Sequence, residues 1–409
     1  MAIYPLHLWY GLQQGPVLDS FKHIVQEYNV EHSNAPVELK DFSDYGAPAR
    51  EALSASMENQ PQLVLAPEFM TGKMKAALKE RRVIPMDTLI DAELLRKMTP
   101  LVKRTFGDSE GNLASLPFNP ACGVLYSNAQ LLQAVGRDPA FSPQTVEELD
   151  AVCKELIEKG LVEAGYTCAW PAAYLVEVPA AQQDLPLAEP ENGALGFGAY
   201  QLSQGWLYNH LLDLRQKVRD KVFVYSGRDN NARKPFTEKK VAFFMQGSTH
   251  HPLLQKEASF PVGCAPLPIL MRGQRGKYAF PLGGAALWAL DNPQTRQMVG
   301  SVRTFLNYLA SEKIQERWHQ ETAYAPVAWP EKLEKEGFYQ DHPLHRAVVE
   351  QTVKAPMGKY SFGIHMPNYD EARKGLVELI EKALDVKNTS DEQVKVLLKE
   401  FDEKFSVKA

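Results

Sequence analysis

The sequence predicts an α/β protein with more than one domain. The chain has 409 residues, whereas a single domain usually contains about 100–200 residues. Before residue 86, short apolar or alternating segments are each followed by a segment of helical periodicity. Strands that alternate with helices form parallel sheets with helices on both faces. A composition of 44% apolar and 23% charged residues leaves enough apolar side chains for the cores of such domains.

Three strand–helix pairs open the chain. The third strand is wholly apolar at its end, as a strand covered on both faces would be. The first helix is introduced by Pro16 and carries an apolar stripe formed by Leu18, Phe21, Val25 and Tyr28. The predicted strands cover 4–9, 37–42 and 62–66, and the predicted helices cover 16–28, 47–58 and 70–82.

A second α/β unit is expected to begin near residue 113. A turn at Asn119-Pro120 is expected to separate its first two strands, and the proline- and alanine-rich segment 166–195 is expected to be irregular. The predicted strands cover 113–118, 122–127, 240–245, 260–266 and 284–290, and the predicted helices cover 128–135, 145–159 and 200–218.

Beyond residue 295 the sequence predicts mostly helices. The stripe of Met298, Val302, Phe305 and Leu309 has helical spacing and is expected to face a core. The last helix begins with the capping-box pattern, in which Ser390 is followed three residues later by Gln393.

Charge and composition argue against several classes of protein. The net charge is −5 with both signs mixed along the chain, so the clustered basic surface of a nucleic-acid-binding protein is not expected. No apolar stretch approaches the roughly 20 residues that a membrane span needs, and the first residues show neither the basic nor the apolar region of a signal peptide.

The sequence contains no motif that predicts catalysis or a cofactor. It lacks the phosphate-binding P-loop, the GxGxxG and GxSxG patterns and the HExxH zinc helix. The four cysteines are widely spaced and are expected to be buried thiols. His250-His251 and the pair His342/His345 are the candidate metal ligands. Adjacent histidines on an extended segment point to opposite faces, and His342 and His345 lie in a polar stretch, so no metal site is predicted.

Side chains at the ends of the first three strands form the candidate site. Ligands of open α/β sheets bind beyond the carboxyl ends of the strands, where this sequence places Trp9, Tyr45 and Glu68. Aromatic faces cover the C–H surface of a hydroxylated ligand, and a carboxylate accepts hydrogen bonds from its hydroxyls. In the alternative interpretation the aromatic residues only cover the end of the sheet. A further alternative, a glycoside-processing enzyme, needs a second carboxylate beside Glu68.

The most specific stretches of the sequence are residues 116–126, 225–228, 283–288 and 318–326 and the run ending at Tyr339. Together they resemble the motifs of one family, the extracellular solute-binding proteins of ABC transporters in the maltodextrin-binding class. The resemblance covers nearly the whole chain and is closest to the members that bind glycerol 3-phosphate or glycerophosphodiesters. It implies a two-lobed periplasmic-binding-protein fold, with residues 1–117 and 283–327 in lobe 1 and residues 118–282 and 328–409 in lobe 2, and a ligand held between the lobes.

The resemblance also implies roles for individual residues. Tyr45 and Glu68 match the residues that bind the glycerol side of the ligand, and Trp170 matches a stacking tryptophan, with Tyr174 as a possible second aromatic residue. The residues that match the family's phosphate contacts are Ser248, the N–H group of Gly283 or Gly284, and Tyr324.

Two departures from the family pattern alter the expected anion site. A phosphate-binding serine is replaced by Ala121, and the family's arginine is replaced by Phe362. Arginine is the bidentate phosphate ligand, so its loss favours a glycerophosphodiester over a phosphate monoester. His250, Lys359 and His365 are the basic residues that could compensate.

The resemblance therefore implies a monomeric binding protein of the periplasm or cell exterior, possibly lipid-anchored, rather than an enzyme. Its partners would be a small polar ligand and the membrane permease of an ABC importer, with no cofactor, metal or nucleic acid. A binding protein of the same fold for a sugar or oligosaccharide is the alternative.

Overall fold

The computed structural model describes residues 4–42, 44–108, 110–276, 278–328 and 331–406. The expected lobes begin at residue 1 and end at residue 409, and both of these positions lie outside the described ranges. The chain forms two compact units. Unit 1 comprises Met1–Ala121 and Leu282–Asp341, and unit 2 comprises Cys122–Pro281 and His342–Ala409. The chain therefore passes from one unit to the other three times along the sequence.

Unit 1 is built on a mixed six-stranded sheet. Its order is β2-β1-β3-β12-β4, and β5 also pairs with β12. The first three strands are parallel, as the sequence predicts, whereas β12 is antiparallel to both β3 and β5. The strands are β1 Leu6–Tyr10, β2 Val37–Asp41, β3 Leu63–Pro67, β4 Val83–Ile84, β5 Leu116–Ala121 and β12 Gly283–Leu290.

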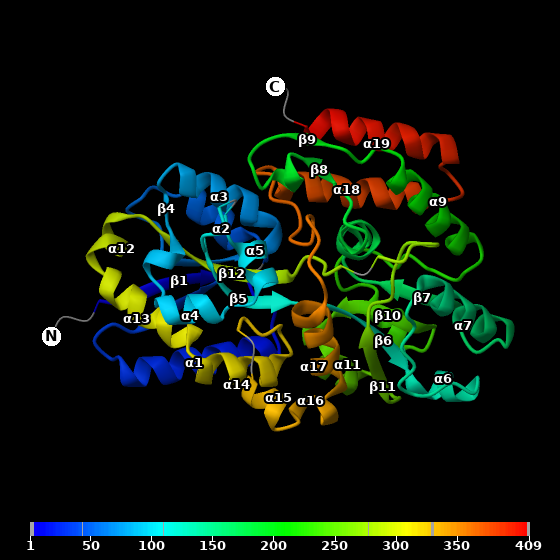
Figure 1. Cartoon of the computed structure of the whole chain (residues 1–409), viewed down its shortest axis with the longest axis horizontal. Helices are drawn as coiled ribbons and strands as arrows, with labels where there is room; N and C mark the ends of the chain where they lie inside the picture. The colour runs from blue at the N-terminus through cyan, green and yellow to red at the C-terminus, as the bar shows by residue number, and fades with distance from the viewer. Residues whose placement is uncertain (1–3, 43, 109, 277, 329–330, 407–409) are drawn as a thin grey trace. The chain divides into compact units, whose positions relative to one another are not determined.

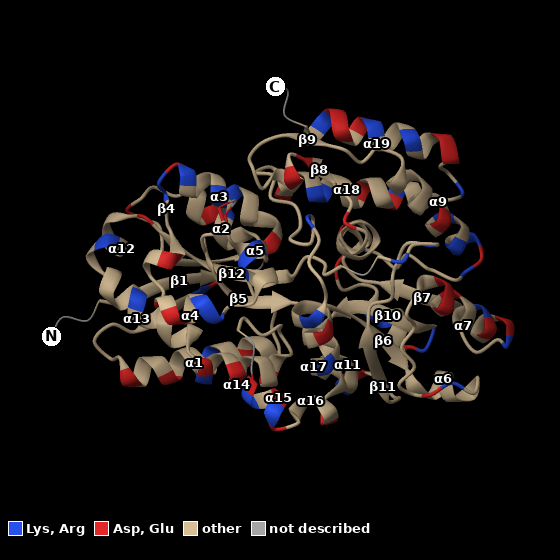
Figure 2. Ribbon diagram, viewed as in Figure 1, with Lys and Arg blue, Asp and Glu red and all other residues tan. Residues whose placement is uncertain are grey.

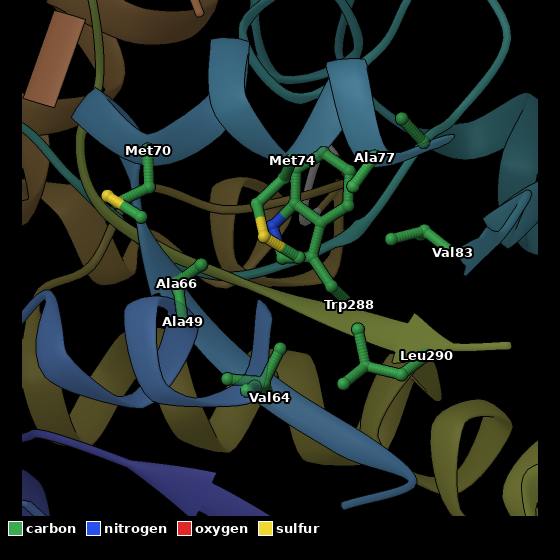
Figure 3. Close-up of a cluster of buried hydrophobic side chains, with 11 residues drawn as sticks. Ala49, Val64, Ala66, Met70, Met74, Ala77, Val83, Trp288 and Leu290 are labelled. Atoms are coloured by element: carbon green, nitrogen blue, oxygen red, sulfur yellow. The ribbon is translucent and has the colours of Figure 1, made fainter. Parts of the chain in front are cut away.

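Helices cover both faces of this sheet (Figure 1). On one face Phe21 of α1 packs against Phe118 of β5 and Trp318 of α14. On the other face α2 and α3 enclose a cluster that includes Met74 and Trp288 (Figure 3). The helices of unit 1 are α1 Pro16–Glu31, α2 Ala47–Ser54, α3 Thr71–Lys79, α4 Ala92–Lys97, α5 Pro100–Phe106, α12 Pro293–Gln297, α13 Val299–Ala310, α14 Glu312–Thr322, α15 Glu331–Lys335 and α16 Phe338–Asp341, with the 3-10 turns Glu68–Met70 and Met86–Thr88.

The turn expected at Asn119-Pro120 is wrong, because β5 continues through both residues to Ala121. Asn119 pairs with Ala285 and Pro120 pairs with Gly284, and the register shifts between Ala285 and Ala286. Prolines lack the N–H donor of a central strand but are tolerated at a bulged or edge strand. Pairing with a strand more than 150 residues later overrides the local turn signal.

Unit 1 also extends beyond the boundaries that the sequence suggested for lobe 1. Residues 118–121 belong to it because they pair with β12. Residues 331–341 belong to it as well. They are held to α14 by Tyr339, whose hydroxyl lies 3.1 Å from Nε2 of His319, and by the ion pair of Lys332 with Glu316 at 3.4 Å.

Unit 2 contains a four-stranded sheet of order β11-β6-β10-β7. Strands β10 and β7 are parallel, and β6 is antiparallel to both β10 and β11. Strands β8 and β9 form a separate two-stranded antiparallel sheet. The strands are β6 Gly123–Asn128, β7 Ala164–Cys168, β8 Ala188–Glu189, β9 Ala199–Tyr200, β10 Val241–Gly247 and β11 Val262–Pro266.

The segment expected to be irregular, 166–195, is largely ordered. Its start belongs to β7, and a π-helical turn, Ala173–Glu177, leads into α8. The side chains of Leu175 and Val176 are buried, so the many alanines form a packed helix rather than a surface loop. The helix expected over 200–218 begins only at Trp206, after β9.

The last helix of unit 2, α19, begins as the sequence predicts. Ser390 and Gln393 form the capping box that the sequence predicts for the last helix. The elements are α6 Ala129–Ala134, α7 Val146–Glu158, η3 Ala173–Glu177, α8 Val178–Gln182, η4 Glu191–Gly193, α9 Trp206–Arg219, α10 Arg233–Thr237, η5 Ser248–His250, α11 His251–Glu257, α17 Pro343–Val349, η6 Glu350–Lys354, α18 Tyr369–Leu384 and α19 Asp391–Phe405.

Charged residues of both signs are interspersed on the outer helices, as α19 shows clearly (Figure 2). This distribution agrees with the mixed charge pattern of the sequence. Among the residues that the structure describes, no helix combines the length and the apolar character that crossing a bilayer requires.

Candidate functional site

Most of the predicted ligand-binding residues of unit 1 lie at one edge of its sheet. The carboxyl ends of β1, β2, β3 and β5 and the amino end of β12 meet there, because β12 runs antiparallel to its neighbours. Tyr45 follows β2 in a turn, and its ring lies 6.5 Å from that of Phe69. The loops after β1 and β2 touch, since a Cβ atom on Gly11 would lie 2.6 Å from the carbonyl oxygen of Asp44.

Glu68 opens the 3-10 turn that follows β3, and it is partly buried. Its position is fixed by the sheet, since the preceding Pro67 pairs with Ala285. Ala285 in turn pairs with Asn119 on β5. A single row across three strands therefore brings Glu68 and Asn119 to the two sides of β12.

Tyr324 lies at the same edge and is rigidly held. Its ring stacks on Trp318 at 5.6 Å between centroids, and Trp318 stacks on Phe118 at 4.8 Å. Its hydroxyl accepts a hydrogen bond from Nδ2 of Asn119 at 3.2 Å. Burial, helped by the charge of Glu68, raises the pKa of Tyr324 to about 12, although the bond from Asn119 opposes the shift. The phenol is therefore a neutral hydrogen-bond donor at physiological pH.

The glycine pair at the start of β12 leaves bare backbone at this edge. Gly284 has a φ of +91°, which side chains rarely adopt. A Cβ atom there would collide with the carbonyl oxygen of Asn119. Gly283 pairs with Ala121 at the end of β5. The close approach of β5 and β12 thus requires glycine at position 284, whatever ligand the edge binds.

Trp9 takes a packing position instead. Its ring lies 5.3 Å from the ring of Phe42, and Nζ of Lys40 lies 4.2 Å from its centroid. It also packs against the apolar cluster of unit 1. With Tyr4 and His7 it lines a hollow of about 450 Å³ that begins at the amino end of β1. These contacts match the alternative interpretation of Trp9 as a cover for the sheet.

In unit 2, Trp170 and Ser248 follow the carboxyl ends of two neighbouring strands, β7 and β10. The N–H group of Ala169 donates to the carbonyl oxygen of Met245 at 3.0 Å and ties the two ends together. Trp170 is partly buried and has a φ of +43°, a strained conformation for a bulky residue. Ser248 is fully buried, and its N–H group donates to the carbonyl oxygen of Cys122 at 2.8 Å.

Tyr174 lies at the same edge of unit 2. A Cβ atom on Gly123, at the amino end of β6, would lie 2.7 Å from its ring. The possible second aromatic residue is therefore close to the strand whose pairing with β10 positions Ser248.

Phe362 is buried, and its ring lies 5.0 Å from that of His365. Of the three basic residues that the sequence offers in place of an arginine, one is paired with a carboxylate and one is uncharged. Lys359 forms an ion pair with Glu191 at 3.6 Å. Burial, with the positive charge of Arg233, lowers the pKa of His250 to about 4, so its ring is neutral at pH 7.

Asn119 is the polar residue of this edge that sequence reasoning missed. The Asn-Pro pair is a local turn signal, and that signal hid a strand position. Residues 116–121 are almost all buried and show no alternation of apolar and polar side chains. Only the pairing with β12 places Asn119 at this edge, and that pairing is not visible from the sequence.

The described residues contain no group of three or more His, Cys, Asp or Glu side chains that could hold a metal ion. The rings of His342 and His345 are nearly perpendicular, with centroids 5.7 Å apart.

Comparison with known proteins gives one consistent result. Residues 23–347 match the family model described as bacterial extracellular solute-binding protein. The sn-glycerol-3-phosphate-binding periplasmic protein UgpB of Yersinia pestis bv. Antiqua (strain Antiqua) is 26% identical over 418 aligned positions, which cover 98% of this chain and 94% of that protein. UgpB of Escherichia coli (strain K12) is 24% identical over 400 positions, covering 95% and 89%.

Solved structures agree on the fold. The GacH receptor of Streptomyces glaucescens, studied unliganded and with acarbose, superposes with a TM-score of 0.78 at 15% identity and covers 99% of this chain and 100% of its own. The cyclic α-maltosyl-1,6-maltose binding protein of Arthrobacter globiformis gives 0.75 at 18% identity, with 98% of each chain covered. Both likenesses confirm the predicted two-lobed α/β fold.

Proposed function

Because the chain belongs to the bacterial extracellular solute-binding proteins, we propose that it captures a small hydroxylated solute outside the cytoplasm and delivers it to the permease of an ABC importer. Its role is binding rather than catalysis. The observation that carries this proposal is the unit 1 edge, where Glu68, Asn119 and Tyr324 are brought together by β12.

The proposed ligand is a glycerophosphodiester. The near full-length likeness to glycerol-3-phosphate-binding proteins supports a glycerol-bearing ligand. Tyr45, Glu68 and Tyr324 of unit 1 and Trp170, Ser248 and Phe362 of unit 2 are the proposed ligand-binding side chains, with the N–H groups of Gly283 and Gly284. Trp9 is omitted because its contacts are those of a packing residue.

Charge favours a ligand with one negative charge over a phosphate monoester. A dianion needs a fixed cation, and Phe362 has replaced the arginine that would supply it. Lys359 and Arg228 are each already paired with a glutamate, Glu191 and Glu381. Neutral donors such as the hydroxyl of Ser248 can hold one negative charge but would leave the second uncompensated.

Calorimetric titration at neutral pH and moderate salt tests the proposal with three probes: glycerol 3-phosphate, its methyl phosphodiester and maltose. The diester is expected to bind most tightly. Clearly tighter binding of the monoester would contradict the charge argument, and binding of maltose alone would favour the sugar-binding alternative. Turnover of a chromogenic glycoside would instead identify an enzyme.

The variant Glu68→Gln tests the site itself. It keeps the shape of the side chain and removes its charge, so affinity for the bound probe is expected to fall by about ten- to hundredfold, the equivalent of about 1.5–3 kcal/mol. Glu80→Gln, an exposed glutamate of unit 1, is the matched control. Unchanged affinity of Glu68→Gln would remove this residue from the site.

A further inference from the structure

A buried amide at the unit 1 edge has an unused hydrogen-bonding atom. The side chain of Asn119 is fully buried. Its Nδ2 atom donates to the hydroxyl of Tyr324 at 3.2 Å, whereas Oδ1 has no hydrogen-bond partner among the residues that the structure describes. Buried polar atoms are nearly always satisfied, and an exception inside a binding edge indicates a position for a ligand or water.

The hydroxyl group of Tyr324, the partner of Asn119, can form a further hydrogen bond. Because the hydroxyl of Tyr324 accepts from Asn119, its own proton remains available for donation. The proton stays on the phenol at neutral pH, because the ordinary pKa of a tyrosine is already near 10 and burial raises that of Tyr324 to about 12. An acceptor and a donor are thus presented side by side.

The ring of Tyr324 cannot turn away readily. Its stack on Trp318 fixes one face. The N–H group of Ala325 donates to the carbonyl oxygen of Pro120 at 2.7 Å, and Ala323 adopts the left-handed conformation that ends α14. The backbone on both sides of Tyr324 is therefore fixed, so the donor is preorganised beside Asn119.

The conclusion does not depend on the orientation of the amide. If Asn119 were turned so that Oδ1 accepted from the phenol, Nδ2 would lack an acceptor and the oxygen of Tyr324 would become the free acceptor. In both orientations the pair offers one donor and one acceptor that the described residues leave unused.

We propose that Asn119 and Tyr324 together form a subsite for a single ligand hydroxyl, which donates to one residue and accepts from the other. Glu68, on the opposite side of β12, takes a second hydroxyl. The inference rests on the proposed function and specifies it: the ligand carries at least two hydroxyl groups at the unit 1 edge, as a glycerol moiety or a sugar does.

This assignment changes the role that the resemblance implied for Tyr324. A phosphodiester oxygen carries no proton, so it can accept from the phenol but cannot satisfy Oδ1 of Asn119. The carboxylate of Glu68 lies close enough to influence the phenol and would repel an anion placed there. A hydroxyl meets both requirements, so the phosphate is left to the other proposed donors, Ser248 and the N–H groups of Gly283 and Gly284.

The test combines a double variant with deoxy ligands. In Asn119→Leu/Tyr324→Phe both partners become apolar with little change of shape, so the unliganded protein is expected to keep its thermal stability. Probes are the methyl phosphodiester of glycerol and its two deoxy analogues, which lack the hydroxyl at carbon 1 or at carbon 2. All three carry one negative charge.

Wild-type protein is expected to bind the complete diester about ten- to hundredfold more tightly than the analogue that lacks the hydroxyl bound by the pair. The double variant should lose this preference and keep the preference for the other hydroxyl. Glu68→Gln should show the opposite pattern. Tyr28→Phe, a buried tyrosine of α1 in the same unit, should behave as wild type.

The outcomes separate the two proposals. Failure of wild-type protein to bind any probe contradicts the proposed function. Binding by wild-type protein with unchanged deoxy preferences in the double variant overturns only the subsite. If wild-type protein binds maltose instead, deoxymaltoses replace the diester analogues in the same comparison. If the double variant does not fold, Tyr324→Phe alone is tested, because it retains the ring stack. It removes the donor of the pair, so its preference for the complete ligand over the deoxy analogue must be smaller than that of the wild type.

Discussion

The interiors of the two units contain different kinds of side chain. In unit 1 the cluster beneath α2 and α3 is formed by apolar side chains, with Met74 against Trp288 near its centre (Figure 3). Unit 2 buries charged side chains as well, among them Arg215 at 1% and Lys217 at 3% exposure. Apolar packing is non-directional, whereas buried charges require specific partners. The interior of unit 2 therefore depends more strongly on individual contacts.

The charges of unit 2 form two networks. In one, Lys217 lies 3.2 Å from Asp150 and 3.0 Å from Asp213, and Arg272 binds both aspartates. Burial nevertheless raises the pKa of Asp150, against the effect of the two cations. Burying these cations and carboxylates removes water from them, which costs free energy. Their contacts with one another offset this cost.

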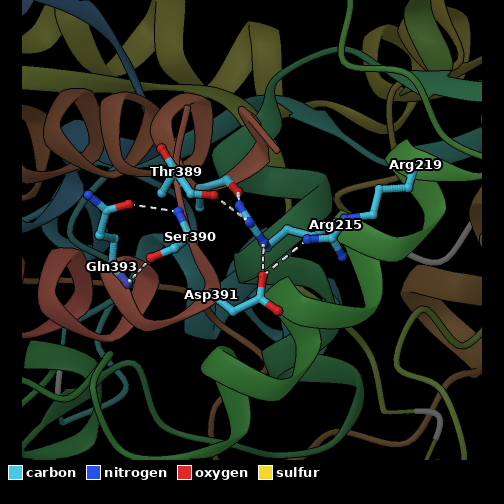
Figure 4. A network of polar contacts seen from close by, with 7 residues as sticks. Arg215, Arg219, Thr389, Ser390, Asp391 and Gln393 are labelled. Atoms are coloured by element: carbon cyan, nitrogen blue, oxygen red, sulfur yellow. Dashed lines mark hydrogen bonds and ion pairs between the residues drawn. The ribbon is translucent and has the colours of Figure 1, made fainter. Parts of the chain in front are cut away.

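In the second network, Arg215 of α9 joins the segment between α18 and α19 (Figure 4). It donates to Asp391 at 2.7 Å and to the carbonyl oxygens of Thr389 and Ala383. The side chain of Arg219 reaches the same carboxylate at 3.2 Å. One guanidinium thus fixes the start of α19 directly beside its capping box.

The largest effect is expected from Lys217→Met. The substitution leaves Asp150 and Asp213 buried without their shared ammonium, and breaking a buried pair in this way costs about 3–5 kcal/mol. The free energy of unfolding, measured by urea denaturation, should fall by this amount. Lys399→Met, which removes an exposed lysine paired with Glu403, is the control and should change little. Equal effects of both variants would contradict the special role of buried charge in unit 2.

Met74→Ala is the corresponding test in unit 1. The side chain is fully buried in the apolar cluster, and deletion of a buried methionine side chain costs about 2–5 kcal/mol. Because no charge is involved, the loss should be the same at low and high salt. Met57→Ala removes a methionine that is 47% exposed and should have little effect. A strongly salt-dependent loss in Met74→Ala would show that its environment is not simply apolar.

Acidification should destabilise the protein through unit 2. Burial, reinforced by Lys217, lowers the pKa of His210 from 6.5 to about 4. The unfolded chain therefore takes up a proton before the folded one, so the stability contributed by neutral His210 is complete above pH 6.5 and is lost as pH falls through about 4. The loss amounts to about 3 kcal/mol.

Urea denaturation of wild type and His210→Asn between pH 7 and pH 4 measures this contribution. The variant should lose less stability than wild type over this range. His23→Asn, at an exposed histidine of α1, should retain the full acid dependence. An acid dependence that is identical in wild type and His210→Asn would contradict the assignment.

The smallest effect is expected at the helix cap. Ser390→Ala removes the acceptor of the N–H group of Gln393, a bond of 3.2 Å, and should cost about 1 kcal/mol. Ser390→Asp keeps an acceptor beside the helix amino end and should restore most of the lost stability. Thermal denaturation compares the three proteins. A larger loss in the aspartate variant would mean that the charge disturbs Arg215 and its partners.

The local pattern of the sequence determined much of this protein. The parallel strands β1, β2 and β3, the buried stripe of α13 and the capping box at Ser390 all follow from spacing and residue type. Because Glu68 directly follows an apolar strand, its position at the sheet edge also followed from the sequence. These features depend on neighbours within one helix or strand, where periodicity and backbone preference decide.

Only the tertiary structure decided which strands lie next to each other and which polar groups they enclose. Strand β12 pairs with β3 and β5 across more than 150 residues, and this pairing turns Asn119 from a turn residue into part of the candidate site. The same limit applies to Lys217, whose helical neighbours reveal Asp213 but not Asp150 or Arg272. Long-range contacts depend on how whole elements pack, because a local sequence pattern gives the direction of a side chain within its element but not the partner that it meets.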